Sequence, residues 1–106
     1  MAAERTHEAT VPALLAEHRQ QVRDIIDAVL PGARVLVFGS RSTGRARPFS
    51  DLDLLFESPS RLAWVERAAL RERFEASDLP FRVDVVDADG LSAALRLRVA
   101  AEARPL

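Results

Sequence analysis

The sequence predicts an α/β domain in which helices cover a small mixed β-sheet. Stretches with apolar residues at helical spacing alternate with short runs of β-branched and aromatic residues, and no repeat or low-complexity tract interrupts them. The length of 106 residues suits one such domain and is too short for two. We expect residues 1–9 to be a polar lead-in and residues 10–106 to form the domain.

The first expected helix begins after a capping threonine. Thr10 can cap it, Pro12 suits its first turn, and Pro31 with Gly32 ends it. Its apolar face is predicted to contain Leu14, Leu15, His18, Val22, Ile25, Ile26 and Val29. We interpret His18 as a partly buried packing residue.

Two short strands follow this helix. Residues 34–38, with the sequence Arg-Val-Leu-Val-Phe, are typical of a buried strand that Gly39 ends. Residues 40–49 are predicted to hold a short polar helix or turn. Residues 52–56 form the second predicted strand.

The second half of the chain predicts two more helices and a third strand. Ser58-Pro59 resembles a cap and first turn of a helix that closes near residues 77–80, with apolar positions at Leu62, Val65, Ala69, Leu70 and Phe74. Residues 81–86 are the third predicted strand. Asp89 is expected to cap a last helix whose apolar face holds Leu91, Leu95 and Val99.

The strand directions can be predicted in part. The first two strands should run antiparallel if the loop after the first and the acidic start of the second form one site. The third strand follows a helical crossover of about twenty residues, so it should lie parallel to the second. Residues 102–106 could add a short edge strand or fray.

Composition excludes several classes of function. The chain has no Cys, Lys, Tyr or Asn, so thiolate zinc sites, thiol nucleophiles, a phosphate-binding lysine and Schiff-base chemistry are ruled out. A net charge of −1 at pH 7 argues against general nucleic-acid binding. We find no signal peptide and no apolar run long enough to span a membrane, and we expect a cytoplasmic protein.

Aspartates on the predicted strands are the anomaly of the sequence. Side chains alternate along a strand, so Asp51 and Asp53 project from one face while Leu52 projects from the other. Asp84 repeats this pattern in the third strand. Adjacent ionised carboxylates repel one another unless a cation screens them.

Three carboxylates suit Mg²⁺ or Mn²⁺, because these ions prefer oxygen ligands. Two ions about 3.5–4 Å apart could flank an in-line phosphoryl displacement. In that arrangement Asp51 and Asp53 would bridge both ions, and Asp84 would bind the ion that activates an acceptor hydroxyl and could take its proton.

A phosphate-binding turn is predicted beside these carboxylates. Gly39 allows close backbone approach, and Ser40 adds a hydroxyl to the free N–H groups of a helix start. Ser50 could cap or orient Asp51. Guanidinium groups in the same loop match phosphate oxygens, and they belong to Arg41, Arg45 and Arg47.

The order Gly39-Ser40, Ser50-Asp51-Leu52-Asp53-Leu54 and Val83-Asp84-Val85 resembles the DNA polymerase β superfamily of nucleotidyltransferases. The resemblance covers about residues 20–105, and the short length is similar to that of minimal nucleotidyltransferases, the antitoxins paired with HEPN-type ribonuclease toxins. Phe49 departs from the pattern, in which a polar residue is commoner.

The resemblance implies a minimal nucleotidyltransferase fold and a site of defined residues. Asp51, Asp53 and Asp84 would be the catalytic metal ligands, with Mg²⁺ as the ion. The nucleotide would bind at Gly39, Ser40, Arg41 and Ser50. The implied reaction transfers AMP from ATP to a hydroxyl, a toxin tyrosine in the antitoxin branch.

Plainer interpretations of each feature remain open. The aspartates could be a solvated sheet face, the Gly-Ser pair an ordinary helix cap, and the arginines a solvated charge run. Trp64 is either packing or a partner surface, and Asp87 with Asp89 are turn and cap residues. A histidine-dependent serine hydrolase is disfavoured, because neither His7 nor His18 is placed for it.

Three functions follow from these alternatives. The chain is an adenylyltransferase that modifies a partner toxin, a non-catalytic antitoxin of the same fold that covers the toxin's surface, or a nucleotide sensor. Because the chain has no Tyr, it cannot modify itself on tyrosine, and its length leaves no room for a separate acceptor-binding domain.

Overall fold

The computed structural model describes residues 14–44, 46–47 and 49–106. The expected lead-in and the first helix's capping residues, Thr10 and Pro12, lie outside these ranges. The helix is confirmed as α2 (Ala16–Val29), which ends just before Pro31 and Gly32, but it starts later than predicted. Leu14 and Leu15, which were predicted on its apolar face, precede its first residue: Leu15 has the extended backbone of a capping residue and is 62% exposed. None of the helices in the described ranges has the length and apolar character needed to cross a bilayer.

The described strands form one mixed sheet in the order β3-β2-β1-β4. β1 (Arg34–Phe38) runs antiparallel to β2 (Leu52–Ser58), and β2 runs parallel to β3 (Val83–Asp87). The tail forms the edge strand β4 (Arg104–Pro105), which pairs antiparallel with β1. The predicted mixed sheet and its strand directions are therefore confirmed.

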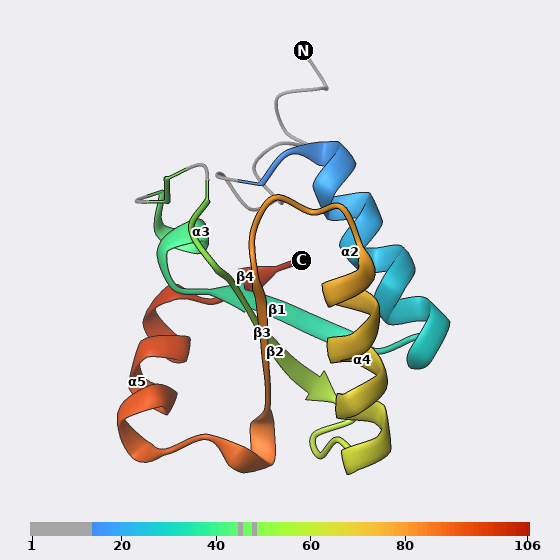
Figure 1. Ribbon diagram of the computed structural model, residues 1–106. Helices are drawn as coiled ribbons and strands as arrows, with labels where there is room; N and C mark the ends of the chain where they lie inside the picture. The colour runs from blue at the N-terminus through green and yellow to red at the C-terminus, as the bar shows by residue number, and fades with distance from the viewer. Residues whose placement is uncertain (1–13, 45, 48) are drawn as a thin grey trace.

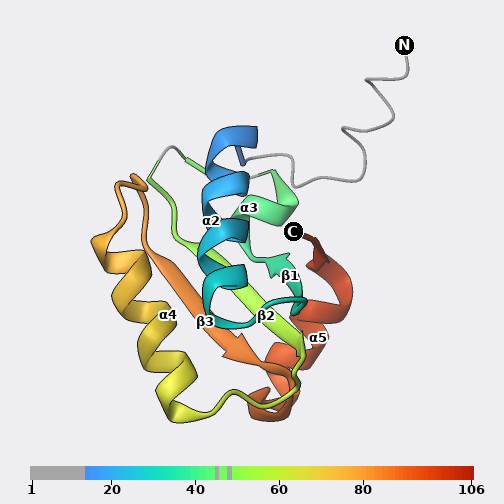
Figure 2. The same ribbon diagram turned by 90° about the vertical axis from the view of Figure 1, so that its right-hand side faces the viewer.

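Helices lie on both sides of the sheet. Figure 1 shows α2 and α4 (Trp64–Ala76) side by side on one face, with α5 (Ala93–Glu102) beyond the other, and Figure 2 shows the same layers turned by 90°. A four-residue helix, α3 (Ser40–Thr43), follows β1 directly. The predicted α/β class of flanking helices on a small sheet is confirmed.

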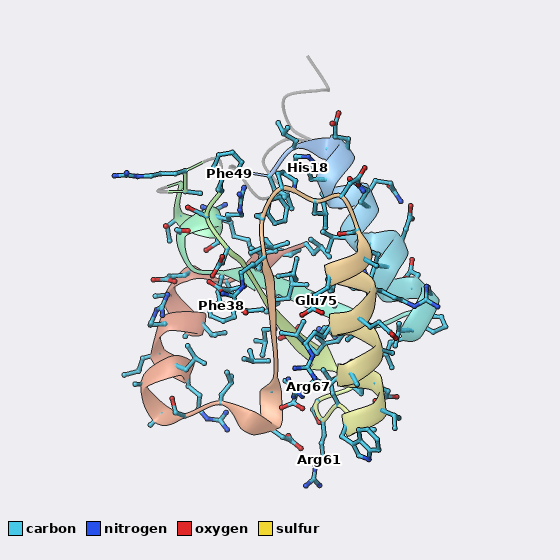
Figure 3. All side chains as sticks on the ribbon, viewed as in Figure 1. His18, Phe38, Phe49, Arg61, Arg67 and Glu75 are labelled. Atoms are coloured by element: carbon cyan, nitrogen blue, oxygen red, sulfur yellow. The ribbon has the colours of Figure 1, made fainter. Side chains whose placement is uncertain are left out.

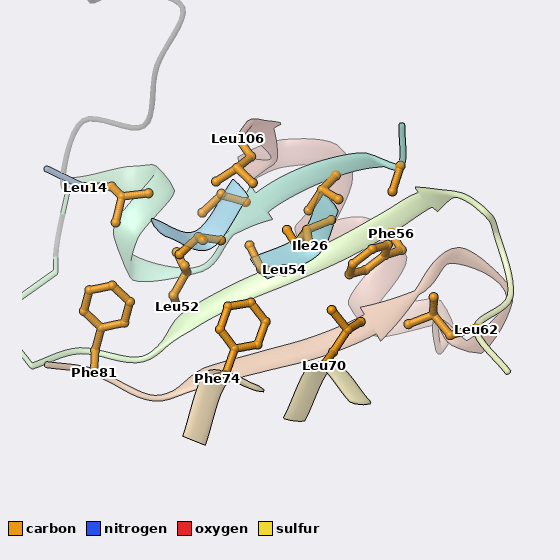
Figure 4. Close-up of a cluster of buried hydrophobic side chains, with 14 residues drawn as sticks. Leu14, Ile26, Leu52, Leu54, Phe56, Leu62, Leu70, Phe74, Phe81 and Leu106 are labelled. Atoms are coloured by element: carbon orange, nitrogen blue, oxygen red, sulfur yellow. The ribbon is translucent and has the colours of Figure 1, made fainter. Parts of the chain in front are cut away.

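The main core fills the space between the sheet and the pair α2 and α4. Alternate residues of β2 point into it, and Figure 4 shows them facing apolar side chains of both helices. Burying a large aliphatic or aromatic side chain contributes about 1.5–3 kcal/mol. The most deeply buried members are Val22, Ile26, Val37, Leu52, Leu54, Phe56 and Leu70.

The helix predicted to begin at Ser58-Pro59 begins at Trp64 instead. Ser58 is the last residue of β2, and long-range hydrogen bonds hold the segment after it. The Ser60 carbonyl accepts from the Asp89 N–H at 2.8 Å, and the Leu62 N–H donates to the buried Asp87 carboxylate at 2.7 Å. These tertiary contacts override the local signal for a helix start.

The prediction that Asp89 caps the last helix is also wrong. Asp89 lies in a short 3-10 helix, η1 (Ala88–Gly90), which Asp87 caps by accepting from the Gly90 N–H at 3.0 Å. The cap of α5 is Ser92, whose hydroxyl accepts from the Leu95 N–H at 3.1 Å. The predicted turn role of Asp87 is therefore confirmed, and the chain makes an extra turn before α5.

Candidate active site

The strand register brings two of the three predicted carboxylates together. Asp53 of β2 is the direct partner of Asp84 in β3, and it also lies opposite Phe38 of β1. Neighbouring strands are about 4.8 Å apart, and side chains at paired positions project from the same face. Asp53 and Asp84 therefore share the sheet face opposite the main core, into which Leu52 and Leu54 point.

Asp53 is the electrostatic centre of this cluster. Its side chain is half-buried, and this burial, followed by the negative charges of Asp84 and Asp51, raises the pKa of Asp53 to about 6. The positive charge of Arg98 in α5 lowers the pKa of Asp53, and the negative charge of Glu102 raises it further. Asp51 is therefore close enough to repel Asp53, as the sequence predicts, although Asp51 is exposed.

The carboxylates share a region without converging on one point. Among the described residues, no three acidic or imidazole side chains are arranged to hold an ion. Asp84 is about half exposed, and its Oδ1 lies 3.8 Å from the Arg82 guanidinium. Three carboxylates are a donor set that fits Mg²⁺ in chemistry, but their side chains would have to rotate toward one another to hold an ion. The magnesium site stays a prediction.

Gly39 is required by the position of Asp53. Its φ is +82°, and a Cβ at this position would overlap the Oδ2 atom of Asp53. Two features therefore exclude a side chain at position 39: the positive φ of the backbone and the nearby carboxylate of Asp53. This contact sets the predicted phosphate turn directly against the predicted metal ligands.

Glu102 is a site residue that the sequence analysis missed. Its Oε1 accepts from the Gly39 N–H at 3.1 Å, and it lies 3.5 Å from the Arg98 guanidinium one turn earlier in α5. The sequence does contain a pattern that could have indicated it: Leu95, Val99 and Glu102 have the i, i+4, i+7 spacing of one helix face. A carboxylate on an apolar face is unusual and indicates a partner.

Serine hydroxyls fix the turn that begins α3. Ser42 is buried, and its hydroxyl donates to the Gly39 carbonyl at 2.9 Å. The Ser42 carbonyl accepts from Arg104 Nε of β4 at 3.0 Å, which ties the turn to the edge strand. Ser40, the predicted nucleotide ligand, is partly exposed at the first position of α3. Its nucleotide-binding role stays a prediction.

Arg41 is buried and joins three segments. Its Nε donates to the Ser50 carbonyl at 2.9 Å, and its guanidinium lies 4.3 Å from the centre of the Phe81 ring. Burial lowers the pKa of Arg41, and the nearby Asp51 opposes that shift. The Ser50 hydroxyl accepts from the Arg47 N–H at 2.8 Å and so closes the turn before β2. Nucleotide binding by Arg41 and Ser50 stays a prediction.

The remaining singled-out residues lie around this centre. Arg47 is exposed, and Arg45 falls outside the described residues. His18 is half-buried and packs edge-on against Phe81, with 5.5 Å between the ring centres, in agreement with a packing role. Trp64 is 79% exposed at the start of α4, so it is not a core residue.

Comparisons with known proteins identify the family of the chain. A family model described as a nucleotidyltransferase domain matches residues 16–106. The chain is 44% identical over 66 residues to a Haemophilus influenzae protein named "Probable protein adenylyltransferase MntA". That match covers 62% of this chain and spans 58% of the relative's length.

Solved structures of similar fold come from the same group of proteins. A toxin-antitoxin crystal structure with AMP-PNP has a TM-score of 0.68 at 26% identity, covering 86% of this chain and 72% of that chain. A structure described as a minimal nucleotidyltransferase has a TM-score of 0.64 at 38% identity, covering 85% and 90%. The resemblance seen in the sequence is thus confirmed, and the chain belongs to the nucleotidyltransferase domain family.

Proposed function

We propose that this protein is a magnesium-dependent adenylyltransferase that transfers AMP from ATP to a hydroxyl of a partner toxin and thereby acts as its antitoxin. The observation that carries the proposal is the parallel register that aligns Asp53 with Asp84 beside the Gly39 turn. The family match, the adenylyltransferase name of a relative and the AMP-PNP in a similar structure support it.

Each residue has a role in the proposed transfer. Asp51, Asp53 and Asp84 would hold Mg²⁺, which supplies positive charge to the phosphates. Ser40 and the Gly39 N–H would bind phosphate oxygens of ATP, and the phosphate would have to replace Glu102 as the acceptor of the Gly39 N–H. The acceptor oxygen forms a bond to the α-phosphorus, the bond to the bridging oxygen breaks, and pyrophosphate leaves with that electron pair. Asp84 would take the acceptor's proton.

The proposal also specifies the class of the partner toxin and the residue that accepts AMP. We take the partner to be a HEPN-type toxin and the acceptor to be a tyrosine hydroxyl, in a cytoplasmic reaction. A similar solved structure is described as the toxin-antitoxin pair MntA-HpeT, in a mutant form, with a TM-score of 0.66 at 26% identity, covering 83% of this chain and 70% of that chain.

A labelling experiment tests the proposal. The assay contains the purified protein, Mg²⁺ and ATP labelled on either its α- or its γ-phosphate. The product of the neighbouring gene is added as the candidate partner toxin. We expect the partner to gain the α-label only, and Asp53→Asn to lose at least about 99% of the rate, as expected when a ligand to catalytic metal is removed. Transfer of the γ-label would indicate a kinase instead.

The same assay separates catalysis from inhibition by contact. If the wild-type protein suppresses the toxin without ATP, and a variant lacking all three aspartates does so equally well, the adenylyltransferase proposal fails and a non-catalytic antitoxin is favoured. If the protein binds ATP without any transfer to the partner, it is a nucleotide sensor.

A further inference from the structure

A groove of about 620 Å³ opens directly beside the candidate active site. Asp51 and Asp84 line it at the site, and Phe49, which is 74% exposed, lines it on the loop before β2. The other wall comes from the end of α4, including Glu75, and from the segment that leads into β3. Figure 3 labels Phe49 and Glu75 at these two walls.

The groove lies on the β3 side of the site. Across the sheet, Gly39 follows β1, Asp53 is on β2 and Asp84 is on β3, with about 4.8 Å between neighbouring strands. β3 is an edge strand of the sheet that the structure describes. A chain of another protein can therefore approach Asp84 from outside without displacing a strand.

The proposed reaction places the acceptor on the β3 side of the site. In an in-line displacement, the attacking oxygen and the leaving group lie on opposite sides of the phosphorus. If pyrophosphate leaves toward the Gly39 N–H, the attacking oxygen must arrive from the β3 side. The groove opens on this side of the site, because Asp51 and Asp84 line it.

Resting on the proposed adenylyl transfer, we infer that this groove seats the acceptor segment of the partner protein, with Phe49 packing against an apolar or aromatic part of that segment. The hydroxyl of the segment reaches Asp84, its oxygen bonds to the α-phosphorus, and pyrophosphate departs on the far side. The proton passes to the Asp84 carboxylate.

The composition of the groove suits a polypeptide. Exposed aromatic residues and arginines are enriched where proteins bind one another. Here Phe49 supplies apolar surface, while Arg71 and Arg82 supply donors for backbone carbonyls of an extended segment.

Steady-state kinetics with the neighbouring-gene product test this inference. We expect Phe49→Ala to raise the KM for the acceptor protein about tenfold, the effect of losing about 1.4 kcal/mol of binding. The KM for ATP should stay within about twofold, and Phe49→Leu should restore most of the acceptor binding. Leu97→Ala is the matched control, because Leu97 is 75% exposed on α5, outside this groove.

Two kinetic outcomes overturn the inference. A rise in the KM for ATP, with the acceptor KM unchanged, would mean that the groove holds the nucleoside. Equal behaviour of Phe49→Ala and Leu97→Ala would mean that the acceptor docks elsewhere.

A crosslinking experiment tests docking in the groove separately from the proposed adenylyl transfer. The photoreactive p-benzoylphenylalanine replaces Phe49 or, as the control, Leu97, and crosslinked peptides of the partner are mapped. A crosslink from position 49 alone to one partner segment supports docking even if no AMP is transferred, and only the adenylyltransferase proposal then fails. Transfer of AMP to a segment that does not crosslink at position 49 overturns the groove assignment.

Discussion

Asp53 is destabilising in the ion-free protein, because the fold half-buries its charge among other carboxylates. We expect Asp53→Asn to raise the free energy of unfolding at pH 7 in EDTA by about 1–2 kcal/mol, allowing for solvent screening of a half-exposed group. Urea denaturation of both proteins measures this difference. Asp24→Asn, an exposed change on α2, is the control.

The sign of the pH dependence follows from the same shift. The pKa of Asp53 rises from 3.8 to about 6 on folding, so the folded state binds this proton more tightly than the unfolded state. The contribution to stability is therefore present below about pH 4 and is lost as the pH rises through 6. The stability of the wild-type protein relative to Asp53→Asn should therefore fall between about pH 4 and pH 6. If it does not fall, the carboxylates do not raise the pKa of Asp53 as inferred.

Gly44 is a control for the loss of a glycine with positive φ, although its ψ of 8° is less restrictive for other residues than the −158° of Gly39. Both have φ near +80°, but a Cβ at Gly44 meets nothing within 4 Å, whereas one at Gly39 overlaps Asp53. We expect Gly44→Ala to cost about 1 kcal/mol and Gly39→Ala to cost more and to displace Asp53. Thermal unfolding and the AMP-transfer rate measure both effects. Equal effects of the two changes would argue against the close approach.

Glu102 places a negative charge at the amide where we expect an ATP phosphate to bind. Replacing it by glutamine removes the charge and weakens the hydrogen bond to Gly39. We expect Glu102→Gln to lower the KM for ATP about fivefold, which corresponds to about 1 kcal/mol. Initial rates at varied ATP concentration measure it, with the exposed Glu72→Gln as control. A raised KM would mean instead that Glu102 supports the turn.

A contact between two residues could be predicted from the sequence only where the geometry of the strands determines it. Alternation along β2 and β3 fixed the shared face of Asp53 and Asp84, so their proximity could be predicted. The contact between Glu102 and Gly39 depends on how α5 packs against β1, and no local pattern contains that information.

At the level of elements, Asp87 joins the start of α4 to the end of β3. Its buried carboxylate accepts from the Leu62 N–H at 2.7 Å, from Arg67 at 3.1 Å and from the Gly90 N–H at 3.0 Å. We expect Asp87→Ala to lower the free energy of unfolding by about 2–4 kcal/mol, because it leaves buried donors without partners.

Chemical denaturation monitored by circular dichroism measures this loss. Asp89→Ala is a matched control two residues away, because the Asp89 side chain is exposed, and it should change stability by less than about 0.5 kcal/mol. Equal losses for the two variants would show that the bonds to Asp87 contribute little.

The element boundaries explain why parts of the fold escaped prediction. Strand 34–38 was predicted with its observed bounds, because a β-branched run between Gly32 and Gly39 leaves little choice. The start of α4 was misplaced because Asp87 holds the preceding segment by a contact between distant parts of the chain. The start of α5 was misplaced because Asp87 caps the short helix η1, which delays the cap of α5 to Ser92. Local capping signals compete poorly with such a network.

For the whole molecule, the carboxylate cluster predicts a stabilising effect of divalent cations. A ligand that binds only the folded state stabilises it by mass action, by about 1 kcal/mol at several times its Kd. We expect millimolar Mg²⁺ to raise the Tm by several degrees in the wild-type protein and much less in Asp53→Asn or Asp84→Asn. Scanning fluorimetry at constant ionic strength, with Na⁺ in place of Mg²⁺, measures this. An equal rise in all three proteins would exclude a specific site.

The whole-molecule architecture was the most predictable level. Alternating helical and strand patterns favoured an α/β arrangement, and the length of the 59–82 crossover favoured the parallel pair that the structure shows. The groove beside Phe49 was not predictable, because its walls come from the loop before β2, the end of α4 and the start of β3.

Acidic and core positions alternate along β2, so the Asp53 side chain projects from the sheet face opposite Leu52 and Leu54. A molecule whose β3 edge opens transiently loses the alignment of Asp53 with Asp84 in the same event that exposes this apolar surface.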